Sequence, residues 1–236
     1  MGGGLMQLVA YGAQDIYLTG NPQITFFKVV YRRHTNFAME AVAQTFEGAV
    51  AAGACVSATI SRNGDLVHRV YLEYAGADKA EEIVDYVELE IGGQLIDRHY
   101  GDWMNIWVEL THSASKKAQY DALKGGLTGD LRSWVPLQFS FCRNPGLAIP
   151  LIALQYHEVK LNFRFSSSLG SGTVCLYCDY IYLDTDERRR FAQTSHEYLI
   201  EQVQANRKNC ITAGCVNKLP LTFNHPVKEL VWKTDA

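Results

Sequence analysis

Apolar and polar residues alternate along much of the chain, which is the period of β-strands that bury one face. The alternation is most regular in Val159–Phe165, where Val, Leu and Phe at every second position are separated by Lys, Asn and Arg. Other stretches with strand character are Thr25–Arg33, Ala38–Phe46, Cys55–Ser61, Leu66–Tyr74, Ile83–Ile91, Gln94–Tyr100, Trp134–Cys142 and Val174–Leu183. The pattern predicts an all-β protein, an antiparallel β-sandwich over about Thr25–Asp184.

Two turn signals divide these strands. Gly92-Gly93 separates two alternating stretches and predicts a tight hairpin, because glycine tolerates the positive φ that such turns require. Asn63-Gly64-Asp65 is also a turn signal, and it predicts a second hairpin between the strands on either side.

One stretch changes from the strand period to the helix period. Trp103, Ile106, Trp107 and Leu110 recur at spacings of three and four residues, and Asp102 is placed to cap their helix. We expect this apolar stripe to pack over the sandwich. A sugar-stacking platform made of the two tryptophans is the less favoured alternative.

Two further helical pieces are short. One is expected at Ser115–Lys124, where a glycine pair follows, so that both helices are inserted between strands. The other begins after Asp184, which can act as its N-cap. Glu187 can bond back to the N-cap as in a capping box, and Arg188–Arg190 favour the C-terminal end of the helix. A Ca²⁺ site at this acidic group is disfavoured, because the glycine and distal glutamate of an EF-hand loop are absent.

The stretch Val174–Leu183 is apolar on both faces, although a sandwich strand with one face in water should not be. We therefore expect a partner over its second face. Leu219–Trp232 is predicted to form two further strands with association-prone apolar residues. The interface candidates are Tyr177, Ile181, Leu183, Phe223, Leu230 and Trp232.

Composition and charge exclude several classes of protein. The 236 residues are 47% hydrophobic, so the chain can bury a sizeable core. The net charge of −3 gives no basis for specific nucleic-acid binding. No apolar run is long enough for a transmembrane segment. A secretory signal and an Asn-X-Ser/Thr acceptor are both missing, so we expect a protein that is not secreted.

Metal, cofactor and catalytic sites are not predicted. Cys175 and Cys178 lie three apart in a strand and point to opposite faces, so free thiols are favoured over a zinc site. We expect no stoichiometric zinc at these two residues or at Cys210 and Cys215. The sequence lacks the G-x-S-x-G, phosphate-loop and H-E-x-x-H motifs, and its histidines are scattered, so no enzymatic activity is expected.

Several long stretches resemble the major capsid proteins of nucleocytoplasmic large DNA viruses, the double jelly-roll family. The first is GAQDIYLTGNPQITFFKVVYRRHTNFAMEAV, within Tyr11–Val42. Four others follow in the family's order: GDWMNIWVELT (Gly101–Thr111), PLIALQYHEVKLNFRF (Pro150–Phe165), YIYLDTDERRRFAQTSHEYLIEQVQ (Tyr180–Gln204) and FNHPVKELVW (Phe223–Trp232). Together they cover 93 of the 236 residues.

The resemblance implies a viral-capsid jelly roll and a division of the chain into four parts. These are an N-terminal arm at 1–24, a first jelly roll at 25–184, an inter-roll connection with a short helix at 185–204, and the first strands of an incomplete second jelly roll at 205–236. The resemblance also implies a structural virion protein of an icosahedral shell, assembled in the host cytoplasm. Its partners would be itself, as a homotrimer in pseudo-hexagonal capsomers, and other capsid proteins, with apposition to an inner virion membrane through minor proteins.

Two other functions are compatible with a jelly roll. A carbohydrate-binding or adhesion module would use the abundant Tyr and Trp residues, and host glycans would then be its partners. A cupin-type metal enzyme is weaker, because the clustered inward-facing histidines that it needs are absent.

Overall fold

A computed structural model describes residues 35–76, 82–125, 132–206 and 214–233. The chain divides into two compact units, residues 1–36 and 37–236. The N-terminal arm and the strand expected at Thr25–Arg33 therefore lie outside the described residues, as does Cys210.

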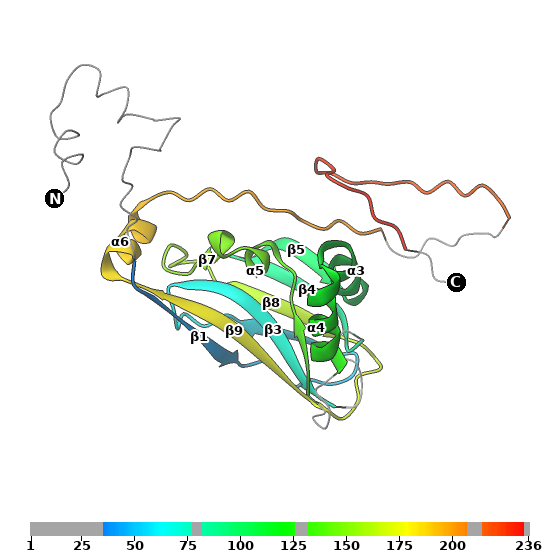
Figure 1. Cartoon of the computed structure of the whole chain (residues 1–236), viewed down its shortest axis with the longest axis horizontal. Coiled ribbons are helices and arrows are strands. Elements are labelled where there is room, and N and C mark those ends of the chain that lie inside the picture. Colours follow the sequence, from blue (N-terminus) through cyan, green and yellow to red (C-terminus); the bar gives the residue numbers. More distant parts are fainter. Residues whose placement is uncertain (1–34, 77–81, 126–131, 207–213, 234–236) are drawn as a thin grey trace, which may run out of the picture. The chain divides into compact units, whose positions relative to one another are not determined.

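The second unit contains two antiparallel β-sheets (Figure 1). One sheet has the order β1-β9-β3-β6, made of β1 (Phe37–Gln44), β9 (Thr173–Leu183), β3 (Leu66–Ala75) and β6 (Arg132–Pro136), with the short β7 (Ile149–Pro150) beside β3. The other has the order β2-β8-β4-β5, made of β2 (Cys55–Thr59), β8 (Val159–Phe165), β4 (Val84–Ile91) and β5 (Gln94–Tyr100). The helices are α3 (Gly101–Thr111), α4 (Ala114–Gly125), α5 (Ser140–Arg143), the 3₁₀ turn η1 (Pro145–Leu147) and α6 (Thr185–Gln193).

The strand order is that of a jelly roll, because strands distant in sequence alternate within each sheet. Both this fold and the helices inserted between strands are confirmed. The hairpin at Gly92-Gly93 is also confirmed: it joins β4 to β5, with φ of 60° and 82° at the two glycines.

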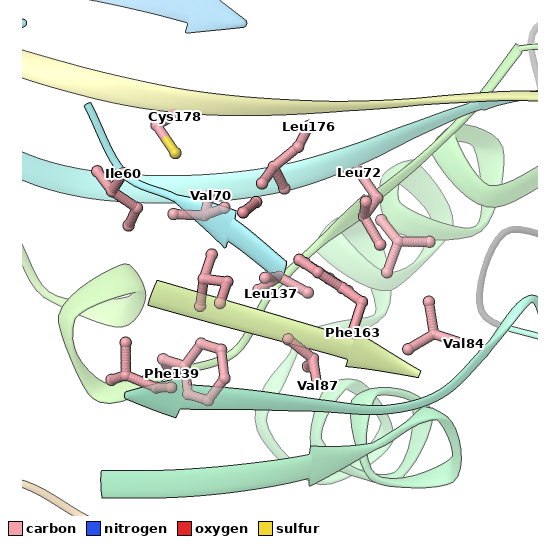
Figure 2. Packing of buried hydrophobic residues seen from close by; sticks show 14 of the residues in the cluster. Ile60, Val70, Leu72, Val84, Val87, Leu137, Phe139, Phe163, Leu176 and Cys178 are labelled. Atoms are coloured by element: carbon pink, nitrogen blue, oxygen red, sulfur yellow. The ribbon is translucent and has the colours of Figure 1, made fainter. Parts of the chain in front are cut away.

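The core fills the space between the two sheets (Figure 2). Leu72 and Leu176 from one sheet and Phe163 from the other are at most 1% exposed. The four apolar residues of β8 are all buried, as its alternation predicts. Each such side chain contributes about 1.5–3 kcal/mol relative to an exposed one.

The hairpin expected at Asn63-Gly64-Asp65 is wrong. β2 pairs with β8 and β3 pairs with β9, so the chain passes here from one sheet to the other. Glycine at position 64 allows the backbone to pass close to Tyr180, because a Cβ at this position would lie 2.8 Å from Cβ of Tyr180. The Tyr180 hydroxyl donates a hydrogen bond to the Ser61 carbonyl at 2.6 Å, which holds the ring against this turn.

The strand expected at Trp134–Cys142 is shorter than predicted. β6 ends at Pro136, and only the Leu137 amide continues the pairing, with the Val70 carbonyl at 2.9 Å. The chain then turns into α5. Leu137, Phe139 and Phe141 are nevertheless buried in the core between the sheets.

Helix α3 buries a different face from the one expected. Its buried residues are Gly101, Met104 and Val108, which share one face of the helix. The predicted stripe lies to one side: Trp103, Ile106 and Trp107 are half-buried and Leu110 is 59% exposed. Tyr100 is the N-cap residue, so the cap expected at Asp102 is also wrong.

The segment after β9 begins with α6. The Asp184 carboxylate accepts a hydrogen bond from the Thr185 amide at 2.8 Å, which confirms that residue as the N-cap. Residues 195–206 and 214–233 contain no β-strand. The two strands expected in Leu219–Trp232 are not formed, because a strand requires ladder hydrogen bonds and none of the described strands pairs with this segment.

Candidate interaction surface

The outer face of the β2-β8-β4-β5 sheet is mostly polar. Its side chains include Ser57, Thr59, Glu88, Glu90, Arg98, Lys160, Asn162 and Arg164. Several of them pair with one another: the Arg98 guanidinium contacts the Glu88 carboxylate, and the Asn162 amide donates to Glu90 at 3.0 Å. This composition is that of a sheet face in contact with water.

The outer face of the β1-β9-β3-β6 sheet is mostly apolar. Residues directly opposite in antiparallel strands share one face, and Phe37 is opposite Leu183 while Met39 is opposite Ile181. The apolar residues assigned to this face by register are Phe37, Met39, Ala41, Ala43, Leu66, Tyr71, Ala75, Trp134, Pro136, Cys175, Tyr177, Ile181 and Leu183. We call this set the apolar face.

Three aromatic rings form the centre of the apolar face. Tyr71 and Tyr177 stack with centroids 5.6 Å apart and planes at 13°. Trp134 lies 5.8 Å from each of them. Such ring pairs contribute about 0.5–1.5 kcal/mol beyond the area they bury.

Two carboxylates beside these rings are tied to the tyrosine hydroxyls. Burial raises the pKa of Tyr71 to about 12, helped by the charge of Asp179 and a hydrogen bond to it. The pKa of Tyr177 is raised by the charge of Glu73 and a hydrogen bond to it. Both hydroxyls therefore remain protonated at neutral pH.

Neighbouring parts of the apolar face differ in exposure. Ile181 is buried in a small cluster with Leu66 and Ala148, and Leu183 and Phe191 pack against it. Phe191 belongs to α6, so the chain itself covers this part of the face. On the edge strand β1, Phe37 is 66% exposed and Met39 is 50% exposed. The uncovered apolar surface is therefore concentrated on β1.

The structure brings together some of the predicted interface residues. Tyr177, Ile181 and Leu183 lie on the apolar face, with Tyr177 and Leu183 half-buried. Phe223, Leu230 and Trp232 belong to residues 214–233, outside the sandwich strands, and Trp232 is 84% exposed. Phe37 and Met39 were missed by sequence reasoning, because only the pairing of β1 with β9 places them beside Ile181.

The described residues form neither a metal-ligand cluster nor a helix that could span a membrane. Within the described ranges, no group of three or more His, Cys, Asp or Glu residues could hold a metal ion. Cys178 is buried and Cys175 half-buried on opposite faces of β9. None of the helices in the described part of the chain has the length and apolar character needed to cross a bilayer.

Two family descriptions match the chain. "Major capsid protein N-terminus" matches residues 25–172, and "Large eukaryotic DNA virus major capsid protein" matches residues 187–236. Among curated proteins, the chain is 55% identical to the major capsid protein of Pyramimonas orientalis virus, over 100% of this chain and 66% of the relative. It is 48% identical to that of Paramecium bursaria Chlorella virus 1, over 98% of this chain and 60% of the relative.

A solved structure agrees with these relatives. The chain is similar to a subunit of the quasi-atomic model of the PBCV-1 virus capsid, with 46% identity and a TM-score of 0.67. This match covers 75% of this chain and 50% of that chain. The Faustovirus major capsid protein shares the fold at 10% identity, with a TM-score of 0.52. The chain thus spans less than two thirds of the length of the two curated relatives and half of the PBCV-1 subunit.

Proposed function

The chain belongs to the major capsid protein family of large eukaryotic DNA viruses, and from this membership we propose that it is a structural subunit of an icosahedral virus capsid. The observation that carries the proposal is the difference between its two sheets. One outer face is polar and paired within itself, whereas the other is apolar and partly uncovered. A shell protein that packs side by side with other domains requires such a face. The proposed role involves no catalytic step.

The partner that fits the apolar face is another jelly roll. A second copy, or a second roll of the same kind, would bury Phe37 and Met39 and leave the polar face in water. We propose that the subunits form homotrimers and that these trimers contact other capsid proteins in the virion. Assembly in the cytoplasm of the infected cell, and apposition to an inner membrane through minor proteins, follow from the same proposal.

The proposed division of the chain follows the family's plan. Residues 25–184 would form the first roll after an arm at 1–24. Residues 185–204 would connect the rolls, and 205–236, whose described part contains no strand in this structure, would add strands to a second roll only when the rest of that roll is present to pair with them. The carbohydrate-binding alternative gains no support from the relatives, which are named as capsid proteins.

Light scattering on the purified chain at micromolar concentration tests the proposal. We expect oligomers, most simply trimers, and we expect Met39→Glu to shift them toward the monomer mass of 26.5 kDa. A charge forced into a buried apolar contact is strongly unfavourable. Leu95→Glu is the matched control, because Leu95 is also 50% exposed but lies on β5 of the other sheet.

Two results would contradict the proposal. One is a monodisperse wild-type monomer, which would mean that the apolar face is satisfied within one chain. The other is an equal decrease of the oligomer mass in Met39→Glu and Leu95→Glu, which would mean that the subunits do not associate through the apolar face.

A further inference from the structure

Edge strand β5 presents a carboxylate and an imidazole toward the core. Asp97 is opposite Leu89 and His99 is opposite Val87, and both apolar partners are buried core residues. Asp97 is 6% exposed and His99 is fully buried. An inward-pointing charge on an edge strand is one way in which proteins discourage pairing with another chain, but a buried charge also requires partners.

Two backbone amides bond to the Asp97 carboxylate, and an imidazole nitrogen lies close to it without making a hydrogen bond. The carboxylate Oδ1 accepts hydrogen bonds from the Arg98 amide at 2.9 Å and from the Val203 amide at 3.0 Å. Its Oδ2 lies 2.8 Å from Nε2 of His99, whose ring stacks on Phe139 at 4.4 Å. Arg98 and His99 belong to β5 itself, whereas Val203 comes from a segment more than a hundred residues later in the chain.

That segment, residues 194–206, is here called the connector, and other contacts hold it to the sandwich. The Gln202 side-chain amide donates to the Ile96 carbonyl, also on β5. The Tyr198 hydroxyl donates to the Ala148 carbonyl at 3.3 Å. Glu201 pairs with Arg143 at 3.0 Å.

Arg143 is itself fixed by the sandwich. Its Nε donates to the Gln138 carbonyl at 2.9 Å, and its guanidinium lies 4.0 Å from the centre of the Trp107 ring. A cation held over an aromatic ring and bonded to backbone is a defined docking point. The connector is therefore attached at several points along its length, unlike a flexible linker.

We propose that Asp97 is a positioning residue that docks the connector across edge strand β5. The docked connector covers the β5 edge against pairing with another chain, and it fixes where the residues after 206 leave the sandwich. The second consequence rests on the proposed capsid function, since it matters only if those residues join a further domain. The docking itself does not depend on that function.

Hydrogen exchange of the Val203 amide in the 236-residue chain tests the docking. Asp97→Ala removes the acceptor, and exchange at Val203 should become about 10- to 100-fold faster, as for loss of a hydrogen bond to a charged group. Asp97→Asn retains one oxygen acceptor and should give an intermediate rate. Glu90→Gln, which changes a carboxylate on β4 that bonds to Asn162, should leave the rate unchanged.

The amide of Phe163 in β8 reports whether the sandwich itself stays folded. Unchanged exchange at Val203 in Asp97→Ala, with Phe163 still protected, would overturn the proposal. If both amides exchange faster in Asp97→Ala, the sandwich itself is destabilised and a second variant is needed. Val203→Pro removes the amide donor of the connector and leaves the sequence of the sandwich unaltered. Cleavage after Glu201 by a glutamate-specific protease should then be about 10- to 100-fold faster than in the wild type, and an unchanged rate would overturn the proposal.

The two proposals fail separately. Exchange at Val203 reports an intramolecular bond on β5, whereas the masses of the Met39→Glu and Leu95→Glu variants report association. A docked connector in a chain that never associates would leave the present inference standing and the capsid function rejected.

Discussion

The ring of Phe46 meets the ring of Phe163 edge-on between the two sheets, with centroids 5.7 Å apart and planes at 82°. Phe163 is 1% exposed, so Phe163→Ala should lower the free energy of unfolding by about 3–5 kcal/mol through lost burial and the cavity that remains. Urea unfolding measures this. Lys160→Ala on the same strand is the control, because Lys160 points to the polar face, and the midpoint should hardly move. A small shift for Phe163→Ala would mean that the inner and outer faces of β8 are reversed.

Gly64 should not tolerate a side chain. In Gly64→Ala the new Cβ would meet Tyr180 at 2.8 Å, and Tyr180 is fully buried, so relief requires movement of the core. We expect a loss of about 1–3 kcal/mol, typical of overpacking. Gly125→Ala is the control, since nothing lies within 4 Å of a Cβ there and alanine favours the helix. Equal unfolding midpoints for the two variants would contradict the close approach.

The cysteines should differ in reactivity. Burial raises the pKa of the Cys142 thiol to about 12, and burial also raises the pKa of Cys178. Cys55 and Cys215 are exposed. Because the thiolate is the reactive form, alkylation of the native protein at neutral pH should modify Cys55 and Cys215 and spare Cys142 and Cys178, whose thiols have raised pKa values. Mass spectrometry of the digested protein gives the extent of alkylation at each cysteine. Rapid labelling of Cys178 would show that this side of β9 is not buried.

Sequence reasoning located the sandwich well because its main signal is local. The alternation in Val159–Phe165 specifies a strand and its buried face without knowledge of any partner, and the structure reproduces both. The hairpin predicted at Gly64 was wrong for the opposite reason. The glycine is needed for its contact with Tyr180, which is far along the chain, and a local turn signal contains no information about that contact.

The candidate surface was only half predictable. Val174–Leu183 indicated that a second face needed cover, but the most exposed part of that face is β1, whose register with β9 is a long-range property. Asp97 is similar, because the Val203 amide that helps to satisfy it lies on the connector. In both cases the missing information was a pairing between distant segments.

The stability of the protein should fall in strongly alkaline solution through Tyr71. Its pKa is raised from 10.0 to about 12 by burial and by Asp179, so the neutral hydroxyl is favoured in the folded state. This contribution is fully present below pH 10 and is lost as the pH rises toward about 12. In Tyr71→Phe no proton can be lost, so the decline in unfolding midpoint over this range should be smaller than in the wild type. Equal declines would exclude Tyr71 as a contributor.

The attachment of the connector should weaken in acid through Glu201. The pKa of Glu201 is lowered below its ordinary value of 4.5, mainly by a hydrogen bond from Lys228. The charges of Lys228 and Arg143 lower this pKa further, whereas desolvation of the carboxylate opposes the shift. A carboxylate with a lowered folded-state pKa stabilises the docked state above pH 4.5, and this contribution is lost as the pH falls through the lowered value. The Glu201 side chain is 46% exposed, so the loss should be modest and salt-sensitive. The Arg143 side-chain Nε–H resonance, followed by NMR as the pH is lowered, should shift in the wild type but not in Glu201→Gln, which cannot titrate. The same shift in both proteins would show that Glu201 does not control this contact.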